Sequence, residues 1–513
     1  METVNAGIPW LTILILLPLL GSLVLAAVKP LRKYARPIAL AISLLVFVLF
    51  LVVYLTEFQM VAADVVQLAE RYPWIPQIGA SFAWGINGVG AVMIGLATLL
   101  VPVVILAEWN RLGEDQQGYF AWVLALEAIM IGLFAARDLF VFYVLFELMI
   151  LPVYFMIGRY GGKDRKRAAM KFVIYSLAGG LIMLIGVIAV YVAGPGGAGG
   201  FLIENLTGTL AMSKTAQLWV FIAFFIGFAI KAPMWPLHTW LPDAAENASA
   251  GTSTLLVGVL DKLGTYGMIA ICLPLFGRAA NTASTVIIVL AIISILWGGF
   301  MAIASKDLMR LVAYTSVSHF GFMILAIFSG SKLAMAGAML YMVAHGIGTA
   351  ALFLVVGFLG QRGGSHLIEN YGGWQRVTPV LAGTFLVAGL ATMALPGLSG
   401  FVPEYMVLMG TFQVNKAAAL VAVLGVILAA MYILLPYQRV FTGPRPDVDV
   451  PDLNGREKTV MGILIAVMLV LGFFPTTVLT AVNPVAEQTA EYVQVGSNAD
   501  NPTAQAVEEG GNK

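Results

Sequence analysis

The chain has 513 residues, of which 60% are hydrophobic and only 11% are charged. So few charged side chains cannot cover the surface of a water-soluble protein of this length, and the composition therefore predicts a membrane protein that crosses the bilayer many times. The formal net charge of +1 gives no reason to expect nucleic acid or an acidic partner.

Apolar runs long enough to cross the hydrocarbon core recur along the whole chain, and we count about fourteen, each of roughly 20 residues. The first run follows Glu2 and no basic residue, so we expect it to stay as a membrane anchor and not to be cleaved as a signal peptide. The fold class is therefore predicted to be all-α and polytopic. In chain order the runs cover approximately residues 8–28, 37–56, 87–107, 119–136, 138–158, 169–193, 217–240, 251–275, 283–304, 308–328, 333–360, 378–412 with a break, 417–438 and 459–480.

The sequence offers little that could hold a redox centre. A single cysteine, Cys272, excludes an internal disulfide, a CxxC motif and an iron–sulfur cluster held by this chain alone. His238, His319, His345 and His366 fall on different segments or loops, so no two of them share a helix that could hold stacked haems. The chain has no GxxxxGKS/T phosphate loop, and ATP is not expected as a direct fuel. We expect no cofactor and no metal on this chain.

Four charged residues lie inside apolar segments: Glu147, Lys231, Lys262 and Glu404. A charge at the bilayer centre costs about 2.5–3.5 kcal/mol even on the lenient insertion scale, so such residues indicate an ion path. Lys231 in FAIKAPMWPLHTWLP and Glu404 in ALPGLSGFVPEYM also lie in segments interrupted by proline, a feature typical of transport sites. These residues predict a protein that moves protons across the membrane.

Glu147 and Lys231 are predicted to act as a switch. Glu147 lies near the middle of segment 138–158, and Lys231 precedes Pro233 and Pro236, whose rings cannot donate backbone hydrogen bonds. A carboxylate beside an ammonium favours the charged forms of both groups, whereas burial favours the neutral forms. Separating the two groups would therefore move a proton. The alternative is that the pair only fixes helix packing, but buried ion pairs seldom add net stability.

Further polar groups extend the predicted path outward from Lys262. His319 and His345 each lie at mid-depth in their segments, and histidine passes protons near neutral pH. Ser316 and Ser318 are candidate hydroxyl relays beside them. A single hydrogen bond across two helices is the competing explanation for both histidines.

The remaining candidates lie at the two ends of the path. Glu404 is in the outward half of segment 378–412 and suits the last station before release, whereas Glu127 is a candidate second carboxylate near Glu147. His238 is a candidate for proton entry, although a loop-capping role competes with it. Asp261 is next to Lys262 and is expected to point to another face of the helix.

The positively charged loops predict how the chain sits in the bilayer. Most lysines and arginines fall in alternate loops, including the basic cluster within 163–171. By the positive-inside rule this side is cytoplasmic, so both termini are expected on the outer side, and an odd number of spans would scramble the separation. The stretch 57–85, rich in Pro, Trp and Gly, reads as an outer loop or hairpin.

Two parts of the chain can be laid over each other as five-helix repeats, 119–275 and 283–438, with the broken segment fourth in each. Because five is odd, the second repeat would be inverted in the membrane, which gives two half-channels that open to opposite sides. The other predicted domains are 1–118 with the first three helices and the outer loop, 459–480 with the last helix, and a polar tail over 481–513.

Three long motifs carry a resemblance to a known family. FYVLFELMILPVYFMIG, FAIKAPMWPLHTWLPDAAENASAGTSTLLVGVLDKLGTYG and SKDLMRLVAYTSVSHFGFM resemble the proton-translocating antiporter-like subunits of respiratory complex I and of the related multisubunit cation/proton antiporters. The resemblance covers nearly the whole chain. It implies a translocase subunit of a bacterial NADH:quinone oxidoreductase in the inner (plasma) membrane, driven by quinone reduction elsewhere in the complex.

The resemblance also implies partners and residue roles. Other membrane subunits, the lipid bilayer, protons and water are the expected partners, while NAD, FMN, iron–sulfur clusters and quinone are expected on partner subunits. The implied roles are the pair gating the inner half-channel for Glu147 and Lys231, the central bridging lysine for Lys262, relay positions for His319 and His345, and the outer terminal acid for Glu404.

Two other functions stay open from the sequence. A sodium/proton antiporter subunit would share the fold and act by secondary transport, and sodium-dependent flux would indicate it. A non-conducting scaffold would only hold enzyme subunits together, and activity that survives neutralisation of all four charged residues would indicate it.

Overall fold

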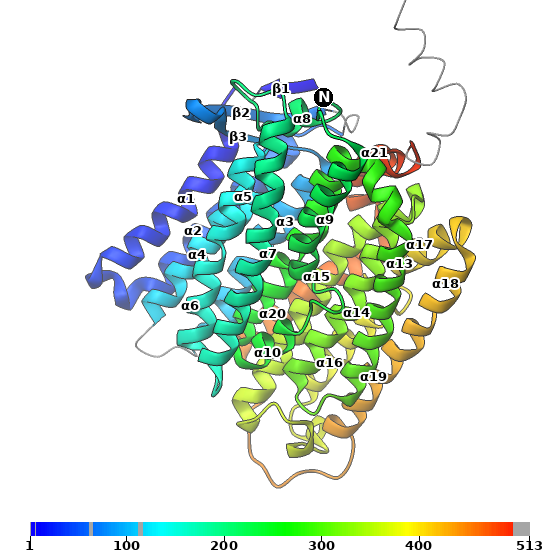
Figure 1. Ribbon diagram of the computed structural model, residues 1–513. Coiled ribbons are helices and arrows are strands. Elements are labelled where there is room, and N and C mark those ends of the chain that lie inside the picture. Colours follow the sequence, from blue (N-terminus) through cyan, green and yellow to red (C-terminus); the bar gives the residue numbers. More distant parts are fainter. Residues whose placement is uncertain (1, 6, 61–64, 111–115, 496–513) are drawn as a thin grey trace, which may run out of the picture.

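Long apolar helices make up almost all of the described chain, which comprises residues 2–5, 7–60, 65–110 and 116–495 of a computed structural model. The helices run roughly side by side, and a small sheet closes one end of the bundle (Figure 1). The first helices are α1 (Trp10–Ala27), η1 (Lys29–Tyr34), α2 (Ala35–Thr56), α3 (Gly88–Ala107), α4 (Gln116–Ala135), α5 (Leu139–Leu148), α6 (Ile150–Tyr160), α7 (Arg165–Ala193) and α8 (Ile203–Leu206).

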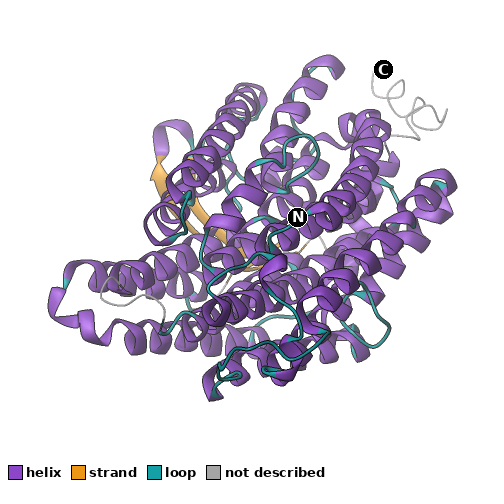
Figure 2. Ribbon diagram, turned by 90° about the horizontal axis from the view of Figure 1, so that it is seen from below, coloured by secondary structure: helices purple, strands orange, loops and turns teal. Residues whose placement is uncertain are grey.

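The stretch 57–85 contains the hairpin that its composition predicted. Strand β2 (Val65–Ile75) pairs antiparallel with β3 (Ala80–Ile86), and β1 (Glu2–Asn5) pairs parallel with β2, so the order is β1-β2-β3. The turn holds η2 (Pro76–Ile78) and Gly79, whose φ of 75° is a conformation that glycine adopts without strain. The view from below shows strands in only one small region and helices in the rest of the cross-section (Figure 2).

The middle of the chain contains the first broken helix. Helix α9 (Lys214–Lys231) ends at the lysine itself, and after a turn over 232–239 the chain continues as α10 (Trp240–Asn247). The next helical run is continuous from Ala250 to Ala304 and has two π-helical segments. Its parts are α11 (Ala250–Leu255), η4 (Leu256–Leu260), α12 (Lys262–Gly267), η5 (Met268–Cys272) and α13 (Leu273–Ala304).

The second broken helix lies in the last third of the chain. Helix α16 (Pro379–Thr392) and helix α17 (Phe401–Val414) are separated by a turn over 393–400, in which Gly397 has a φ of 92°. The breaks predicted in segments 217–240 and 378–412 are therefore both present. The other elements are α14 (Leu308–Phe328), α15 (Lys332–Gly363), η6 (Ile368–Asn370), η7 (Trp374–Arg376), α18 (Lys416–Ala422), α19 (Leu424–Phe441), α20 (Gly455–Phe473) and α21 (Thr476–Val495).

Side-chain caps fix where several of the central helices begin. The carboxylate of Asp138 accepts hydrogen bonds from the amides of Phe140 and Val141 at the start of α5, at 2.9 and 3.1 Å. Asp307 caps α14 in the same way. Such caps satisfy amides that have no partner inside the helix. They fix where α5 and α14 begin, and therefore how far along these helices Glu147 and His319 lie.

The long apolar helices are divided differently from the predicted segments in two places. Among the described residues, eleven helices are long and apolar enough to cross a membrane, or twelve if the bent pair α20 and α21 is one span. Segments 251–275 and 283–304 are joined by helix, because the chain passes through a kink at Phe276 without a loop. Segment 378–412 is divided into two short helices. The total of about fourteen spans, like the inverted repeats, stays a prediction.

The polar tail predicted over 481–513 is wrong for its first part. Residues 481–495 form most of α21, which is bent by 61° against α20. One face of α21 is apolar and packs on the bundle, with Val482, Ala486 and Ala490 buried. The segment is polar in its average composition, but its apolar residues lie on one face and make it an amphipathic helix. Residues 496–513 of the predicted tail lie outside the described residues.

Helices α14 and α15 lie at the centre of the bundle. Almost every side chain of both helices is buried, including those of Ser316, Ser318, His319, His345 and Thr349. In contrast, α1, α2 and α7 lie at the periphery and expose many leucine, isoleucine and valine side chains. The candidate residues of α14 and α15 are therefore surrounded by protein, a medium in which charges and hydrogen bonds have strong effects.

Candidate functional site

Lys262 occupies the centre of the site, fully buried at the start of α12. Its Nζ atom donates to the carbonyl oxygen of Val257 at 2.6 Å and lies 2.7 Å from Nδ1 of His345. The π-helical turn of η4 places these groups, since the amide of Asp261 bonds to the carbonyl of Leu256, five residues earlier. Short π-helical segments of this kind are frequent at functional sites.

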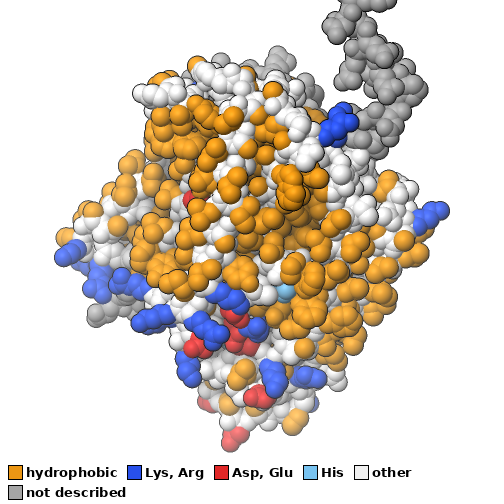
Figure 3. All heavy atoms as spheres, viewed as in Figure 1, with side chains coloured by type: hydrophobic (Ala, Val, Ile, Leu, Met, Phe, Trp, Pro, Cys, Tyr) orange, Lys and Arg blue, Asp and Glu red, His pale blue; other side chains and the backbone are white. Residues whose placement is uncertain are grey.

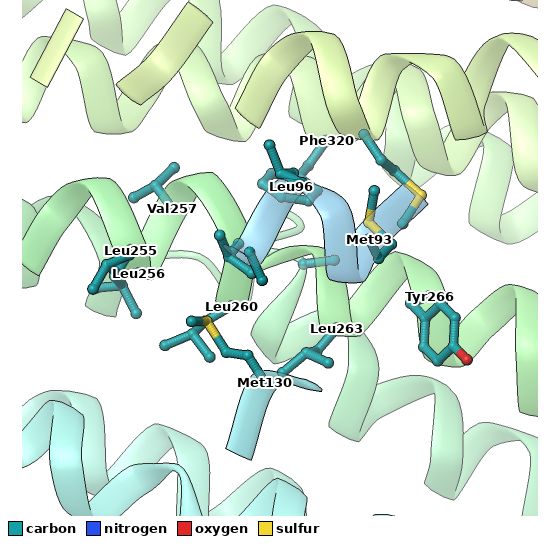
Figure 4. Close-up of a cluster of buried hydrophobic side chains, with 14 of the residues drawn as sticks. Met93, Leu96, Met130, Leu255, Leu256, Val257, Leu260, Leu263, Tyr266 and Phe320 are labelled. Atoms are coloured by element: carbon teal, nitrogen blue, oxygen red, sulfur yellow. The ribbon is translucent and has the colours of Figure 1, made fainter. Parts of the chain in front are cut away.

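Apolar side chains from three other helices pack around the helical turn that precedes this lysine. Met93 and Leu96 of α3, Met130 of α4 and Phe320 of α14 pack around Leu260 and its neighbours on η4 and α12 (Figure 4). The Phe320 ring lies 5.3 Å from the Nζ atom of Lys262 and adds a cation–π contact. The lysine is thus held in an environment of low polarity, where its protonation depends strongly on nearby groups.

Two histidines continue outward from Lys262. The rings of His345 and His319 have centroids 5.2 Å apart, and Nε2 of His319 lies 3.1 Å from the hydroxyl of Tyr432. Their second ring nitrogens, Nε2 of His345 and Nδ1 of His319, are buried and have no hydrogen-bond partner in the described part of the chain. Both rings therefore have a nitrogen available for proton exchange.

The chain of polar groups ends at a buried glutamate. The ring of Tyr341 lies 5.7 Å from that of His319, and its hydroxyl donates to Oε2 of Glu404 at 2.7 Å. Glu404 is in the first turn of α17, directly after the break in the helix. A small cavity bordered by His319, Tyr341, His345 and Thr392 has room for about one water molecule. We call Lys262, His345, His319, Tyr341 and Glu404 the outer row.

Lys231 and Glu147, which we call the inner pair, lie on neighbouring helices and interact electrostatically. The Nζ atom of Lys231 donates to Oγ of Ser176 at 3.0 Å and lies between the rings of Phe172 and Phe146, at 4.9 and 5.4 Å. Glu147 is half-buried, and none of the described residues forms a hydrogen bond with its Oε1 atom. Their charges attract, but no salt bridge within 4 Å joins these two described residues.

A glycine of α7 makes room for the carboxylate of the inner pair. A Cβ atom at Gly180 would overlap the side-chain oxygens of Glu147. Together with Ser176, one turn earlier on the same helix, this position lets α7 contact both members of the pair. The inner pair is therefore an arrangement of three helices, α5, α7 and α9.

The other candidate residues lie apart from this path. Glu127 is fully buried in α4, and within the part of the chain that the structure describes both its carboxylate oxygens lack a hydrogen-bond partner. Among the described residues, no hydrogen bond or ion pair joins it to Glu147. His238 is buried on the turn between α9 and α10, with its ring 6.2 Å from that of Tyr314. Among the described residues, neither of them has a hydrogen bond or an ion pair with the inner pair.

Ion pairs near His238 tie three helices together. Asp243 of α10 binds Lys171 of α7 at 2.6 Å and Arg310 of α14 at 2.7 Å, and Arg310 also binds Glu246 at 2.8 Å. The loop-capping role considered for this region is compatible with these contacts, which hold the second half of the broken helix in place.

Sequence reasoning missed several groups of the site. Ser316 and Ser318, expected as relays, donate to the carbonyl oxygens of Val312 and Ile295 instead. The hydroxyls of Ser176, Tyr341 and Tyr432 were not predicted, because serine and tyrosine are ordinary packing residues in membrane helices and carry no pattern that marks them. Only a three-dimensional arrangement brings them beside the charged groups.

The arrangement is suited to proton transfer. Carboxyl, amine, imidazole and phenol groups each bind and release protons, and here they succeed one another across the buried centre of the bundle. In the part of the chain that the structure describes, no group of three or more His, Cys, Asp or Glu side chains is placed to hold a metal ion.

Comparison with known proteins gives consistent matches. The family model described as NADH:quinone oxidoreductase/Mrp antiporter, TM, matches residues 136–430. NADH-quinone oxidoreductase subunit M of Mycobacterium tuberculosis is 42% identical over 522 residues, which cover 94% of each chain. The corresponding protein of Rhodobacter capsulatus is 36% identical, covering 92% of this chain and 95% of its own.

Solved structures agree with these relatives. A chain of respiratory complex I from Thermus thermophilus with bound NADH superposes with a TM-score of 0.86 at 32% identity, covering 94% of this chain and 99% of its own. A chain of the Mrp complex from Dietzia sp. DQ12-45-1b has a TM-score of 0.84 at 22% identity, with coverage of 95% and 99%, and at that identity shares the fold alone.

Proposed function

This chain belongs to the family of antiporter-like membrane subunits of NADH:quinone oxidoreductase that includes subunit M and chain 4, and we propose that the inner pair and the outer row form its proton path. The chain is a proton-translocating membrane subunit of that enzyme, and its partners are the other membrane subunits of the complex. The open point is which side chains carry the protons, and in what order.

The inner pair is the proposed loading site. Lys231 holds a proton as the ammonium, which the hydroxyl of Ser176, two aromatic rings and the charge of Glu147 stabilise. When the attraction of Glu147 is lost or neutralised, burial favours the neutral amine, and the proton leaves. The half-buried position of Glu147, beside the exposed side chain of Leu148, lets a neighbouring subunit act on the carboxylate.

The outer row is the proposed exit path. Lys262 receives the proton and passes it to Nδ1 of His345, after which His319 and Tyr341 carry it to Glu404. One helix break follows α9, and the other separates α16 from α17. The end of α9 therefore lies at Lys231, and the start of α17 lies at Glu404. Unpaired backbone groups there can bind water next to Lys231 and Glu404.

We infer the orientation and location from the distribution of charge. Lysines and arginines gather mostly around the lower end of the molecule, opposite the sheet (Figure 3). The positive-inside rule makes that end cytoplasmic, and it puts β1 and α21 on the outer side of a bacterial inner membrane. Protons would then move from the end with His238 toward the end that Glu404 faces.

We also infer that the redox chemistry takes place on partner subunits. Cys272 is the single cysteine of the chain and is buried, so this subunit cannot supply the set of thiolates that an iron–sulfur cluster needs. NAD, FMN, iron–sulfur clusters and quinone are accordingly assigned to other subunits. This chain contributes proton binding and release and no covalent step.

The observation that carries the proposal is the contact of a fully buried lysine, Lys262, with His345 at the head of an ordered row that ends at Glu404. The test replaces Lys231 or Glu147 by alanine in the whole complex, reconstituted in liposomes. NADH-driven proton uptake should be abolished while assembly and subunit composition stay intact.

The matched control is Lys214→Ala, which removes an exposed lysine from the first turn of the same helix, α9. It should pump like the wild type. Normal pumping by Lys231→Ala would reject the proposed path. Flux that needs sodium and continues when quinone reduction is blocked would instead identify a sodium/proton antiporter.

A further inference from the structure

The proposed path has a gap between its two parts. The Nζ atom of Lys231 bonds to Ser176 in α7, whereas that of Lys262 bonds to Val257 and His345. Among the described residues, no hydrogen bond joins the inner pair to the outer row. A proton needs a group between the two lysines that can accept it from one side and give it to the other.

Asp261 is a buried carboxylate that the proposed path has not used. It is 1% exposed, and neither Oδ1 nor Oδ2 has a hydrogen-bond partner among the described residues. Burial of a polar group without a partner is unfavourable, and the great majority of buried polar atoms in native proteins are bonded. Packing alone gives no reason for an aspartate at this position.

The side chain of Asp261 faces a different direction from that of Lys262. Neighbouring residues on a helix point to different faces, whereas residues three apart share a face, so Asp261 lies on the face of Gly264. That face packs on α9: a Cβ atom at Gly264 would overlap the carbonyl oxygen of Phe228 and the amide of Ala232. Asp261 therefore faces the end of α9, where Lys231 is the last helical residue.

The charges of both lysines act on this carboxylate. The positive charges of Lys262 and of Lys231 both attract the carboxylate of Asp261. No ion pair within 4 Å joins it to either lysine among the described residues, so neither amine holds it in a permanent salt bridge. It is thus placed between two proton carriers and is free to exchange with each.

We propose that Asp261 carries the proton across the gap between Lys231 and Lys262, an inference that rests on the proposed function. In the first transfer the ammonium of Lys231 gives a proton to the carboxylate of Asp261, leaving a neutral amine and a carboxylic acid. In the second, the Oδ–H bond breaks and an N–H bond forms on the neutral amine of Lys262. A bridging water or a change of rotamer completes each transfer.

This assignment explains why adjacent residues are both charged in the middle of a membrane protein. The side chain of Asp261 points toward α9, and that of Lys262 points toward α15. The junction of η4 and α12 therefore connects the inner pair with the outer row. The carboxylate also keeps the two lysines from carrying positive charge next to each other without compensation.

The test is Asp261→Asn in the whole complex, because asparagine keeps the shape and cannot release a proton. Removing a positioned proton-transfer group slows the transfer by on the order of 100-fold or more, so NADH-driven proton uptake should fall nearly as far as in Lys231→Ala. Asp261→Glu keeps the carboxyl group and should retain most of the pumping. Thr265→Val is the control, since it removes another buried polar group from the next turn of α12.

A solvent isotope effect separates proton transfer from structural damage. In Asp261→Asn the residual pumping should slow more strongly in D₂O than wild-type pumping does, because transfer across the gap has become the slow step. A structural defect would lower the amount of assembled complex and leave the isotope effect at its wild-type value, which would overturn the inference.

The remaining outcomes are also decisive. Wild-type pumping by Asp261→Asn, with Lys231→Ala inactive, would overturn the role of Asp261 and leave the proposed function standing. Wild-type pumping by both variants would overturn the two together. If Asp261→Asn does not assemble, Asp261→Glu decides: an assembled complex that pumps supports the inference, and an assembled complex that does not pump contradicts it.

Discussion

Alanine at Gly180 is expected to impair proton pumping without removing any charged or polar group. The added Cβ would overlap the carboxylate of Glu147, which must move away because the backbone of α7 is fixed by its own packing. Glycine in a helix interior is less stable than alanine by up to about 1 kcal/mol. Folding of α7 itself is therefore not expected to suffer, and the effect should appear in function.

The size of the effect follows from the charge interaction within the inner pair. For two unit charges several ångström apart at an effective dielectric constant of about 20, a displacement of about 2 Å changes the Coulomb energy by about 1 kcal/mol. A protonation equilibrium that depends on this pair then shifts by about fivefold, since about 1.4 kcal/mol corresponds to a factor of ten. We expect a several-fold loss of pumping, smaller than the complete loss in Glu147→Ala.

The assay is NADH-driven proton uptake into liposomes, measured together with NADH oxidation and the amount of assembled complex. Gly462→Ala is the matched control, because a Cβ at this helical position of α20 has no atom within 4 Å. It should behave as the wild type. An assembled Gly180→Ala complex that pumps at the wild-type rate would refute the reasoning that the position of Glu147 controls the proton on Lys231.

Two further variants test the outer row and the scaffold. Tyr341→Phe removes the hydroxyl that donates to Glu404, and loss of a hydrogen bond to a charged group costs about 1.5–3 kcal/mol. Proton uptake should therefore fall at least tenfold while the complex assembles normally. Unchanged uptake would contradict the proposal that protons leave along the outer row. Arg362→Ala breaks the buried ion pair with Glu457 at 2.6 Å, a change that costs about 3–5 kcal/mol. This variant should lower the melting temperature of the purified complex without changing the number of protons pumped per NADH by the complex that remains folded. An unchanged melting temperature would contradict the stabilising role of this ion pair.

The sequence predicts those parts of the fold that depend on residues next to one another along the chain. Apolar runs must become helices in a bilayer, since no water is present to satisfy the backbone. Pro233 and Pro236 lack the amides that would continue α9, so the break after Lys231 could be expected. The sequence does not predict that segments 251–275 and 283–304 form one continuous helical run. The polar residues between them are equally compatible with a loop and with the end of a helix.

The charged residues of the site can be predicted from the sequence, because a charge in an apolar run is rare and energetically unfavourable. The polar residues that contact them cannot be predicted in this way. The hydroxyls of Ser176 and Tyr341 reach the charged groups from other helices, over sequence separations of 55 and 63 residues, and such pairings depend on how the helices pack. The position of Asp261 along its own helix shows only that it points away from Lys262, whereas the packing of the helices brings that face to α9.

Ordered water in a high-resolution map of the assembled complex tests most directly whether protons follow these residues. We expect water molecules or direct hydrogen bonds to connect Lys231, Asp261 and Lys262, and to continue beside His319 to Glu404 and the outer surface. A dry, apolar barrier between any two of these groups, present in every state of the complex during turnover, would contradict the proposed path.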